Sequence, residues 1–240
     1  MITQKDKEYL TGLKTTHPEI HNFIQHLLDD YRQDTLLGCH DISNIISLIY
    51  GNFQLMELTT SGLTDNPRWT QMSEDIHFLV NSMEAVSYYR YSHLIKREVM
   101  SLDAFVNEYL VPLIDSTKYH HLHIHTNICN EQVTINIDPN KLTFVIKAII
   151  DNISEYDCDA NVQVSLYSEQ EKLIISISDD CSIIDSGTMS KMFQPFNTNK
   201  TTHIGLSLSS SYQIVMAHEG NIEISPIEDK GYKYIISIPL

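Results

Sequence analysis

The sequence predicts an α+β protein in which an N-terminal helical hairpin precedes an α/β sandwich. Over the first hundred residues, apolar side chains recur at steps of three and four, as on one face of a helix. After about residue 100 the pattern alternates with period 2, which is typical of strands, and helix-like runs separate the alternating segments. The chain has 240 residues, of which 42% are hydrophobic and 20% charged, enough for one large domain or two modest ones. We therefore predict two domains, at residues 1–100 and 101–240.

The hairpin is predicted from two apolar seams and the break between them. The first seam comprises Ile42, Ile46, Ile49, Phe53 and Met56. The stretch TTSGLTDNPRW then interrupts the helix with glycine, asparagine and proline. The second seam comprises Trp69, Met72, Ile76, Leu79, Met83 and Val86. One hairpin leaves much of both seams exposed, so we expect a second copy to complete a dimeric four-helix bundle. The aromatic stretch VSYYRYSH, at residues 86–93, should form the base of the second helix and pack against the C-terminal domain.

Six alternating segments and two helix-like runs define the predicted C-terminal domain. HLHIHTNI and QVTINID read as strands, and Pro139 then opens the helix-like NKLTFVIKAIIDNISEY. The strands NVQVSLYSE and KLIISISD follow, then a loop-rich stretch and the helix-like GLSLSSSYQIVMAHEG. The last strands, NIEISPI and YKYIISIPL, are close enough to form a hairpin. We expect a mixed sheet with helices on one face.

The composition indicates which kinds of partner and which cellular environment to expect. The formal net charge is −15 and the chain has no lysine- or arginine-rich run, so neither duplex nucleic acid nor an anionic membrane is an expected partner. The four cysteines lack the C-x-x-C spacing of a zinc site and indicate reduced thiols. No apolar run approaches the roughly 20 residues that span a bilayer. We expect a soluble cytoplasmic protein.

His40, Asp41 and Asn44 interrupt the apolar pattern of the first helix. At 100° per residue, His40 points away from the seam and Asn44 lies one turn further on. An exposed imidazole can act as a nitrogen nucleophile, and a neighbouring carboxylate can orient it or serve as a base for water. Asn44 could hold an attacking water. The alternative is that these three residues belong to an ordinary solvated helix face.

The order of motifs along the chain resembles bacterial two-component histidine kinases. HDISN, with Gly51 eleven residues after His40, is similar to their phospho-acceptor helix in the H-D-x-x-N branch. INIDPNKLTFVIKAIIDNISEY resembles their N-box, and LIISISDDCSIID occupies the place of the first glycine box. MFQPFNTNK resembles the F-box, and HIGLSLSSSYQIVMAHEGNIEIS the second glycine box. The resemblance, over roughly residues 32–240, implies a C-terminal ATPase domain of the Bergerat type shared with gyrase and Hsp90.

The resemblance also implies roles for single residues. His40 corresponds to the phospho-acceptor, with Asp41 and Asn44 assisting. Mg²⁺ and ATP are the expected cofactors, with Asn152 as the metal ligand and Asp179 accepting from the adenine amino group. Lys200 corresponds to the lysine that reaches the γ-phosphate. Thr198 corresponds to a lid residue, and Gly205 and Leu206 to the loop that approaches the phosphates.

Three departures from the family pattern keep two functions open. The first glycine box has Cys181 and Ile183 where glycines are expected, and Ala148 replaces the earlier N-box asparagine. The second glycine box keeps only its middle glycine.

The first hypothesis is a histidine kinase, without a sensor segment, that autophosphorylates on His40 and passes the phosphoryl group to the receiver domain of a response regulator. The alternative is a histidine phosphotransferase of the sporulation type, phosphorylated on His40 by a phospho-receiver domain. A phosphatase acting on the partner through Asp41 and Asn44 is compatible with both.

Overall fold

The computed structural model divides the chain into two compact units, residues 1–84 and 85–240. It describes residues 14, 16–115, 119, 121–128, 133–155, 159–180, 186–189, 191–198, 204–227 and 231–240. Within α2, the side chains at 25–41 and 43 lie outside the description. The predicted functional boundary at residue 100 stays a prediction. Among the described residues, no helix combines the length and the apolar character that a membrane crossing requires.

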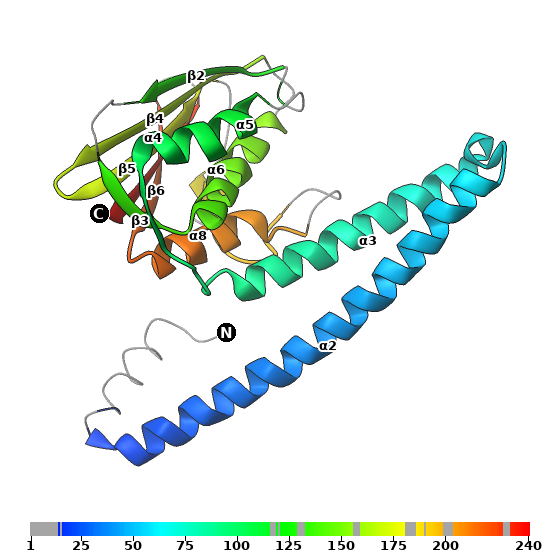
Figure 1. Ribbon diagram of the computed structural model, residues 1–240, viewed down its shortest axis with the longest axis horizontal. Coiled ribbons are helices and arrows are strands. Elements are labelled where there is room, and N and C mark those ends of the chain that lie inside the picture. The colour runs from blue at the N-terminus through cyan, green and yellow to red at the C-terminus, as the bar shows by residue number, and fades with distance from the viewer. Residues whose placement is uncertain are drawn as a thin grey trace. The chain divides into compact units, whose positions relative to one another are not determined.

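The first unit is a helical hairpin, visible in Figure 1 as two long helices joined at one end. Helix α2 spans Pro18–Thr59, and α3 spans Pro67–Tyr91. A 3-10 turn, η1 (Leu63–Asp65), follows Gly62, whose φ of 74° is left-handed. The predicted break between the helices is therefore confirmed. Phe53 of α2 stacks on Trp69 of α3 with ring centroids 4.2 Å apart, and both side chains are buried.

The first seam is divided between a buried and an exposed part. Ile46 and Phe53 are buried within the hairpin, at 8% and 5% exposure. Ile42, Ile49 and Met56 remain about half exposed, at 50%, 48% and 50%. One hairpin therefore covers only part of the apolar surface of α2, as the sequence predicts.

The second unit is built on a five-stranded mixed sheet of order β2-β4-β5-β7-β6. Its strands are β2 (His123–Ile128), β4 (Asn161–Glu169), β5 (Lys172–Asp179), β6 (Asn221–Pro226) and β7 (Tyr232–Pro239). β2 and β4 are parallel, and the other neighbours are antiparallel. The predicted mixed sheet and the β6–β7 pairing are thus confirmed.

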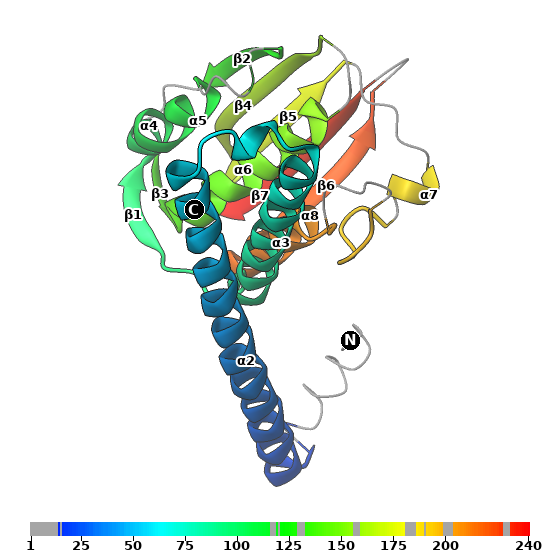
Figure 2. The ribbon, with the colours of Figure 1, turned by 90° about the vertical axis from the view of Figure 1, so that its right-hand side faces the viewer.

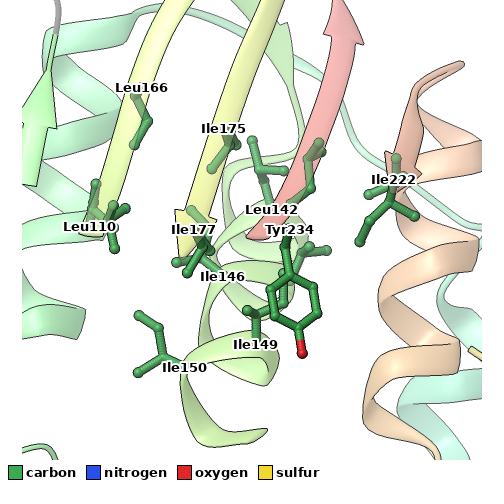
Figure 3. Packing of buried hydrophobic residues seen from close by; sticks show 14 of the residues in the cluster. Leu110, Leu142, Ile146, Ile149, Ile150, Leu166, Ile175, Ile177, Ile222 and Tyr234 are labelled. Atoms are coloured by element: carbon green, nitrogen blue, oxygen red, sulfur yellow. The ribbon is translucent and has the colours of Figure 1, made fainter. Parts of the chain in front are cut away.

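Helices cover one face of this sheet, as predicted. Figure 2 shows α6 (Pro139–Ser154) and α8 (Ser207–Ala217) lying against it. Along β4 and β7, buried inward residues alternate with residues that are exposed or half-buried. Figure 3 shows aliphatic side chains of β4 and β5 meeting those of α6. The six α6 side chains that are fully buried are Leu142, Val145, Ile146, Ile149, Ile150 and Ile153. Their spacing gives α6 a wide apolar face, which fixes the helix on the sheet.

The sequence did not predict the segment between residues 98 and 114. It forms β1 (Glu98–Ser101), α4 (Leu102–Phe105), the π-helical η2 (Val106–Leu110) and α5 (Val111–Ile114). β1 pairs antiparallel with β3 (Thr134–Ile137) in a separate two-stranded sheet. The predicted strand QVTINID is therefore real, but it lies outside the main sheet. A short helix, α7 (Ser186–Met189), follows β5.

Residues 85–97 pack as part of the second unit. The Tyr88 ring stacks on Phe144 of α6, with centroids 3.9 Å apart, and the Lys141 ammonium lies 4.7 Å from the Tyr88 ring centre. The backbone N–H of Lys96 donates to the Asp138 carboxylate at 2.8 Å. The predicted packing of VSYYRYSH against the C-terminal domain is confirmed by these contacts.

Candidate functional site

The predicted phospho-acceptor residues lie on α2. The helix runs without a break from Pro18 to Thr59, so His40 and Asn44 stand about one turn apart along it. The Asn44 side chain is exposed. The side chains of His40 and Asp41 lie outside the described residues, and their predicted roles stay predictions.

Asn152 lies near the C-terminal end of α6. The helix begins at Pro139, and the Asp138 side chain caps it by accepting from the Lys141 N–H at 3.0 Å. Asn152 is half-buried, and its amide nitrogen donates to the Tyr234 hydroxyl at 3.2 Å. The amide oxygen is consequently the end of the side chain that can ligate a cation.

Asp179 ends β5 and is buried, with 3% of its surface exposed. Its Oδ2 accepts from the Tyr232 backbone N–H at 3.3 Å. Gly231 lets the backbone that leads into β7 lie this close to Asp179. A Cβ on Gly231 would lie 1.9 Å from the Asp179 carbonyl oxygen, and its φ of +92° favours glycine. A buried carboxylate requires hydrogen-bond donors, and an adenine amino group is a suitable one.

Sheet register brings Asn152 and Asp179 to the same side of the sheet. Tyr234, the partner of Asn152, is paired with Ile177 of β5. Asp179 lies two residues beyond Ile177, so it projects from the same face, roughly 7 Å further along the strand. Both predicted nucleotide residues therefore lie on the helix-covered face, at the C-terminal end of β5.

Asp180, the neighbouring carboxylate, is held by a different partner. Its two oxygens accept from Asn161, at 2.8 Å from the backbone N–H and 2.6 Å from the side-chain amide. The hydrogen bond from the Asn161 side chain is the main reason that the pKa of Asp180 lies below its ordinary value. Asp180 thus ties the end of β5 to the start of β4.

The described part of the predicted lid brings the F-box against Gly205, in front of α8. The Gly205 carbonyl accepts from the Phe196 N–H at 3.0 Å. Gly205 has a φ of +69°, and a Cβ there would lie 2.9 Å from backbone atoms of Asn197. The surviving glycine of the second glycine box is thus required by its packing against the F-box. Thr198 is exposed, and Lys200 lies outside the described residues.

Leu206 leads into α8 and is almost fully buried, at 1% exposure. Its carbonyl accepts from the Ser210 N–H and from the Ser209 and Ser210 hydroxyls, at 2.8, 2.9 and 2.8 Å. These bonds fix the first turn of the helix. Among the described residues, no side chain caps the start of α8. Amide N–H groups at such a helix start can approach an anion.

Of the departures in the N-box and the first glycine box, the structure describes Ala148. Ala148 is buried in α6, at 5% exposure, one turn before Asn152. A methyl group at that position supplies no ligand. Cys181 and Ile183 lie outside the described residues.

Sequence reasoning missed Tyr234 and Gly231. Tyr234 looks like any inward aromatic of an alternating strand, and nothing in the pattern marks its hydroxyl. Gly231 precedes the last strand, and a glycine at that point was the available signal. His218 was missed as well: it is fully buried, and its Nε2 accepts from the Asp138 N–H at 2.9 Å.

Comparison with known proteins finds similarity to histidine kinases, in both a family model and individual sequences. Residues 137–240 match the family described as histidine kinase-, DNA gyrase B-, and HSP90-like ATPase. The chain is 24% identical to the signal transduction histidine-protein kinase AtoS of Escherichia coli (strain K12), over 84% of this chain and 33% of AtoS. It is also 24% identical to sporulation kinase A of Bacillus subtilis (strain 168), over 83% of this chain and 33% of that kinase. The chain therefore spans about a third of the length of these relatives.

Two solved structures share the fold over most of the chain. Full-length ShkA in complex with AMPPNP aligns with a TM-score of 0.73 and 14% identity, over 86% of this chain and 45% of ShkA. Histidine kinase ThkA in complex with the response regulator protein TrrA aligns with a TM-score of 0.60 and 18% identity, over 97% of this chain and 66% of that chain. At these identities the likeness is one of fold.

Proposed function

We propose that this chain is a two-component sensor histidine kinase that autophosphorylates on His40 with Mg²⁺-ATP. The phosphoryl group then passes to an aspartate of a response regulator receiver domain. The observation that supports this best is that Asn152 and Asp179 lie on the same, helix-covered side of the sheet, at the C-terminal end of β5. A cytoplasmic homodimer is the form in which we expect the chain to act.

The donor set suits a magnesium nucleotide. The buried Asp179 carboxylate can accept from the adenine amino group, and Gly231 leaves no side chain between Asp179 and β7. The Asn152 amide oxygen is a hard, neutral ligand, which suits a cation that is also held by phosphates. Lys200 would reach the γ-phosphate as a compact positive charge. Thr198, Gly205 and Leu206 would form the lid and the backbone that faces the phosphates.

In the proposed reaction, the first unit supplies the nucleophile, which is the imidazole of His40. When bound, Mg²⁺-ATP would supply the γ-phosphoryl group to a ring nitrogen of His40, and ADP would leave as the bond from the γ-phosphorus to the β,γ-bridging oxygen breaks. Asp41 would raise the basicity of the imidazole by holding its other nitrogen. Asn44, one turn away, would orient a water for dephosphorylation of the receiver domain. Positioning and charge neutralisation supply most of the rate in such transfers.

The proposed homodimer rests on the exposed apolar side of α2. Ile42, Ile49 and Met56 are about half exposed, although they lie on the same seam as the buried Ile46 and Phe53. A second hairpin would cover them in a four-helix bundle. The solved ThkA structure contains the response regulator TrrA, which supports a receiver domain as the partner for this chain also.

One observation favours the second candidate function. Ala148 provides no polar group one turn from Asn152, where the sequence resemblance expects an asparagine. A histidine phosphotransferase has no need of a complete nucleotide site. In that case His40 would receive its phosphoryl group from a phosphorylated receiver domain.

Incubation with γ-labelled ATP and Mg²⁺ tests the proposal. We expect the wild type to acquire acid-labile label, His40→Ala to acquire none, and His21→Ala, a matched change on the same helix, to be labelled like the wild type. Asn152→Ala should reduce labelling by weakening the cation site. An unlabelled wild type that accepts phosphoryl from a phosphorylated receiver domain, and only with His40 present, would replace the kinase with the phosphotransferase.

A further inference from the structure

Tyr234 brings a hydroxyl among the mostly aliphatic side chains that fill the space between the sheet and α6. Its side chain is 1% exposed and projects from β7 towards α6, as Figure 3 shows. The other inward residues of β7 beyond it are Ile236 and Ile238, both almost fully buried. A phenylalanine would fill the same space without a hydroxyl to desolvate. Burying that hydroxyl is unfavourable unless it is hydrogen-bonded, and its bond to Asn152 meets this requirement.

The bond distinguishes the two ends of the Asn152 amide. An asparagine side chain presents an acceptor oxygen at one end and a donor NH₂ at the other, and rotation about χ2 exchanges them. Only the oxygen can ligate a cation. With Nδ2 donating to the Tyr234 hydroxyl at 3.2 Å, the oxygen is the end turned away from Tyr234.

We propose that Tyr234 is a positioning residue that fixes the Asn152 amide with its oxygen towards the nucleotide-bound Mg²⁺. The proposal rests on the proposed function, since it requires a Mg²⁺-nucleotide at this site. Tyr234 itself touches neither the cation nor the nucleotide. Its hydroxyl therefore contributes to the part of nucleotide affinity that depends on Mg²⁺, and not to the part that remains when the metal is chelated.

The test is a calorimetric titration with ADP, in Mg²⁺ and in EDTA. ADP is the probe because it binds without turnover. The measured quantity is the Mg²⁺ advantage, defined as the affinity for ADP in Mg²⁺ divided by the affinity in EDTA. We expect Tyr234→Phe to reduce this ratio about threefold to tenfold, the size expected for losing one neutral hydrogen bond. Affinity in EDTA should stay at the wild-type value.

Tyr119→Phe is the matched control. Tyr119 is also buried, and its hydroxyl donates to Asp151, the neighbour of Asn152 on α6, at 2.7 Å. This change likewise removes a buried tyrosine hydroxyl bonded to α6, so thermal unfolding of the two variants can be compared directly. We expect Tyr119→Phe to leave the Mg²⁺ advantage unchanged.

Two changes at Asn152 complete the design. On an Asn152→Ala background, Tyr234→Phe should have no further effect on the Mg²⁺ advantage, because no amide is left to orient. Asn152→Asp presents an oxygen at either end, so its Mg²⁺ advantage should resist Tyr234→Phe. This second background keeps the test decisive if Tyr234→Phe lowers the stability of the protein.

The outcomes separate the inference from the proposed function. A wild type whose ADP affinity depends on Mg²⁺, with an unchanged ratio in Tyr234→Phe, overturns the positioning role and leaves the proposed function intact. Equal losses in Mg²⁺ and in EDTA assign Tyr234 a purely structural role and also overturn it. If the wild type binds no ADP at millimolar concentration in either buffer, both the proposed nucleotide site and the positioning role of Tyr234 are wrong.

Discussion

At the residue scale, two adjacent carboxylates have opposite surroundings. Asp179 is buried on the helix-covered face, whereas Asp180 accepts both hydrogen bonds from Asn161. Alternation along the strand end separates them, so one carboxylate faces the proposed adenine site while the other fastens two strands together. The chemistry proposed for Asp179 therefore cannot be taken over by its neighbour.

Replacing Asp179 with Asn should weaken ADP binding about tenfold to a hundredfold. The change exchanges one acceptor oxygen for a donor facing the adenine amino group, and a mispaired buried polar site costs about 1–3 kcal/mol. Calorimetric titration measures the loss. Asp180→Asn is the matched control and should bind ADP with wild-type affinity. Equal affinities for wild type and Asp179→Asn would remove Asp179 from the nucleotide site.

Gly205→Ala should destabilise the contact between the F-box and the backbone that precedes α8. An alanine at a φ of +69° is strained, and its Cβ would lie 2.9 Å from backbone atoms of Asn197. We expect a cost of about 1 kcal/mol or more. Hydrogen exchange should detect it as faster exchange of the Phe196 amide, which donates to the Gly205 carbonyl. Gly51→Ala is the control: nothing lies within 4 Å of the added Cβ, so the exchange rate of the Phe196 amide should be unaffected.

At the element scale, a buried histidine links α6 to α8. His218 donates from Nδ1 to the Ile214 carbonyl at 2.8 Å and accepts at Nε2 from the Asp138 N–H at 2.9 Å. Asp138 caps α6 and accepts from the Lys96 N–H. Both ring nitrogens are thus engaged as in a neutral imidazole. Burial is the main cause that lowers the pKa of His218 below its ordinary value, and the bond to Ile214 opposes the shift.

This arrangement predicts a pH dependence of stability. The unfolded chain takes up a proton on His218 at a higher pH than the folded chain does. The stabilisation is therefore present above the unfolded pKa, about 6.5, and is lost as the pH falls towards the folded pKa. Urea unfolding should show that the wild type loses more stability than His218→Gln between about pH 7.5 and about pH 5.5.

The control for this measurement is His125→Gln. His125 is exposed on β2, so its replacement should leave the pH dependence of the wild type unaltered. The Arg97–Glu219 ion pair and Lys141 lie near His218 and are retained in both variants. If His218→Gln loses as much stability as the wild type over the same range, His218 does not carry the dependence.

The elements that could be predicted from sequence are those with an unambiguous period. NVQVSLYSE and KLIISISD match β4 and β5 residue for residue, because their inward residues are aliphatic and buried. β1 has four residues, and Val99 within it is 73% exposed. Too few residues alternate there to define a strand. The π-helical η2 also interrupts the helical period between α4 and α5, so the apolar spacing did not indicate a helix.

Some residues of the candidate site could be predicted from the sequence, and others become apparent only in the folded chain. Asn152, Asp179 and Gly205 could be found because each lies in a motif whose order along the chain is recognisable. Tyr234 could not, because its role depends on the register that sets it beside Ile177 and below α6. The reason for retaining Gly205 was also hidden, since the contact with Asn197 is made only in the folded chain.

At the scale of the whole molecule, the apolar surface of α2 exceeds what one hairpin buries. Besides Ile42, Ile49 and Met56, the helix exposes Ile45, Leu48 and Leu55, at 57%, 68% and 59%. A contiguous apolar surface of this kind on a helix marks a protein interface. The net charge of −15 opposes non-specific association, so a specific apolar contact is the expected means of assembly.

Light scattering should therefore return twice the chain mass of 27.6 kDa. Ile49→Glu should yield a monomer, because it buries an unpaired charge in the proposed interface, where the cost is several kcal/mol. The hairpin itself should survive, since Ile49 is 48% exposed within one chain and Phe53 and Trp69 keep their stack. Gln54→Glu introduces the same charge on the opposite side of α2 and should remain dimeric. A wild type that is monomeric at micromolar concentration would remove the four-helix bundle, whereas a dimer that tolerates Ile49→Glu would assign assembly to a surface other than this seam.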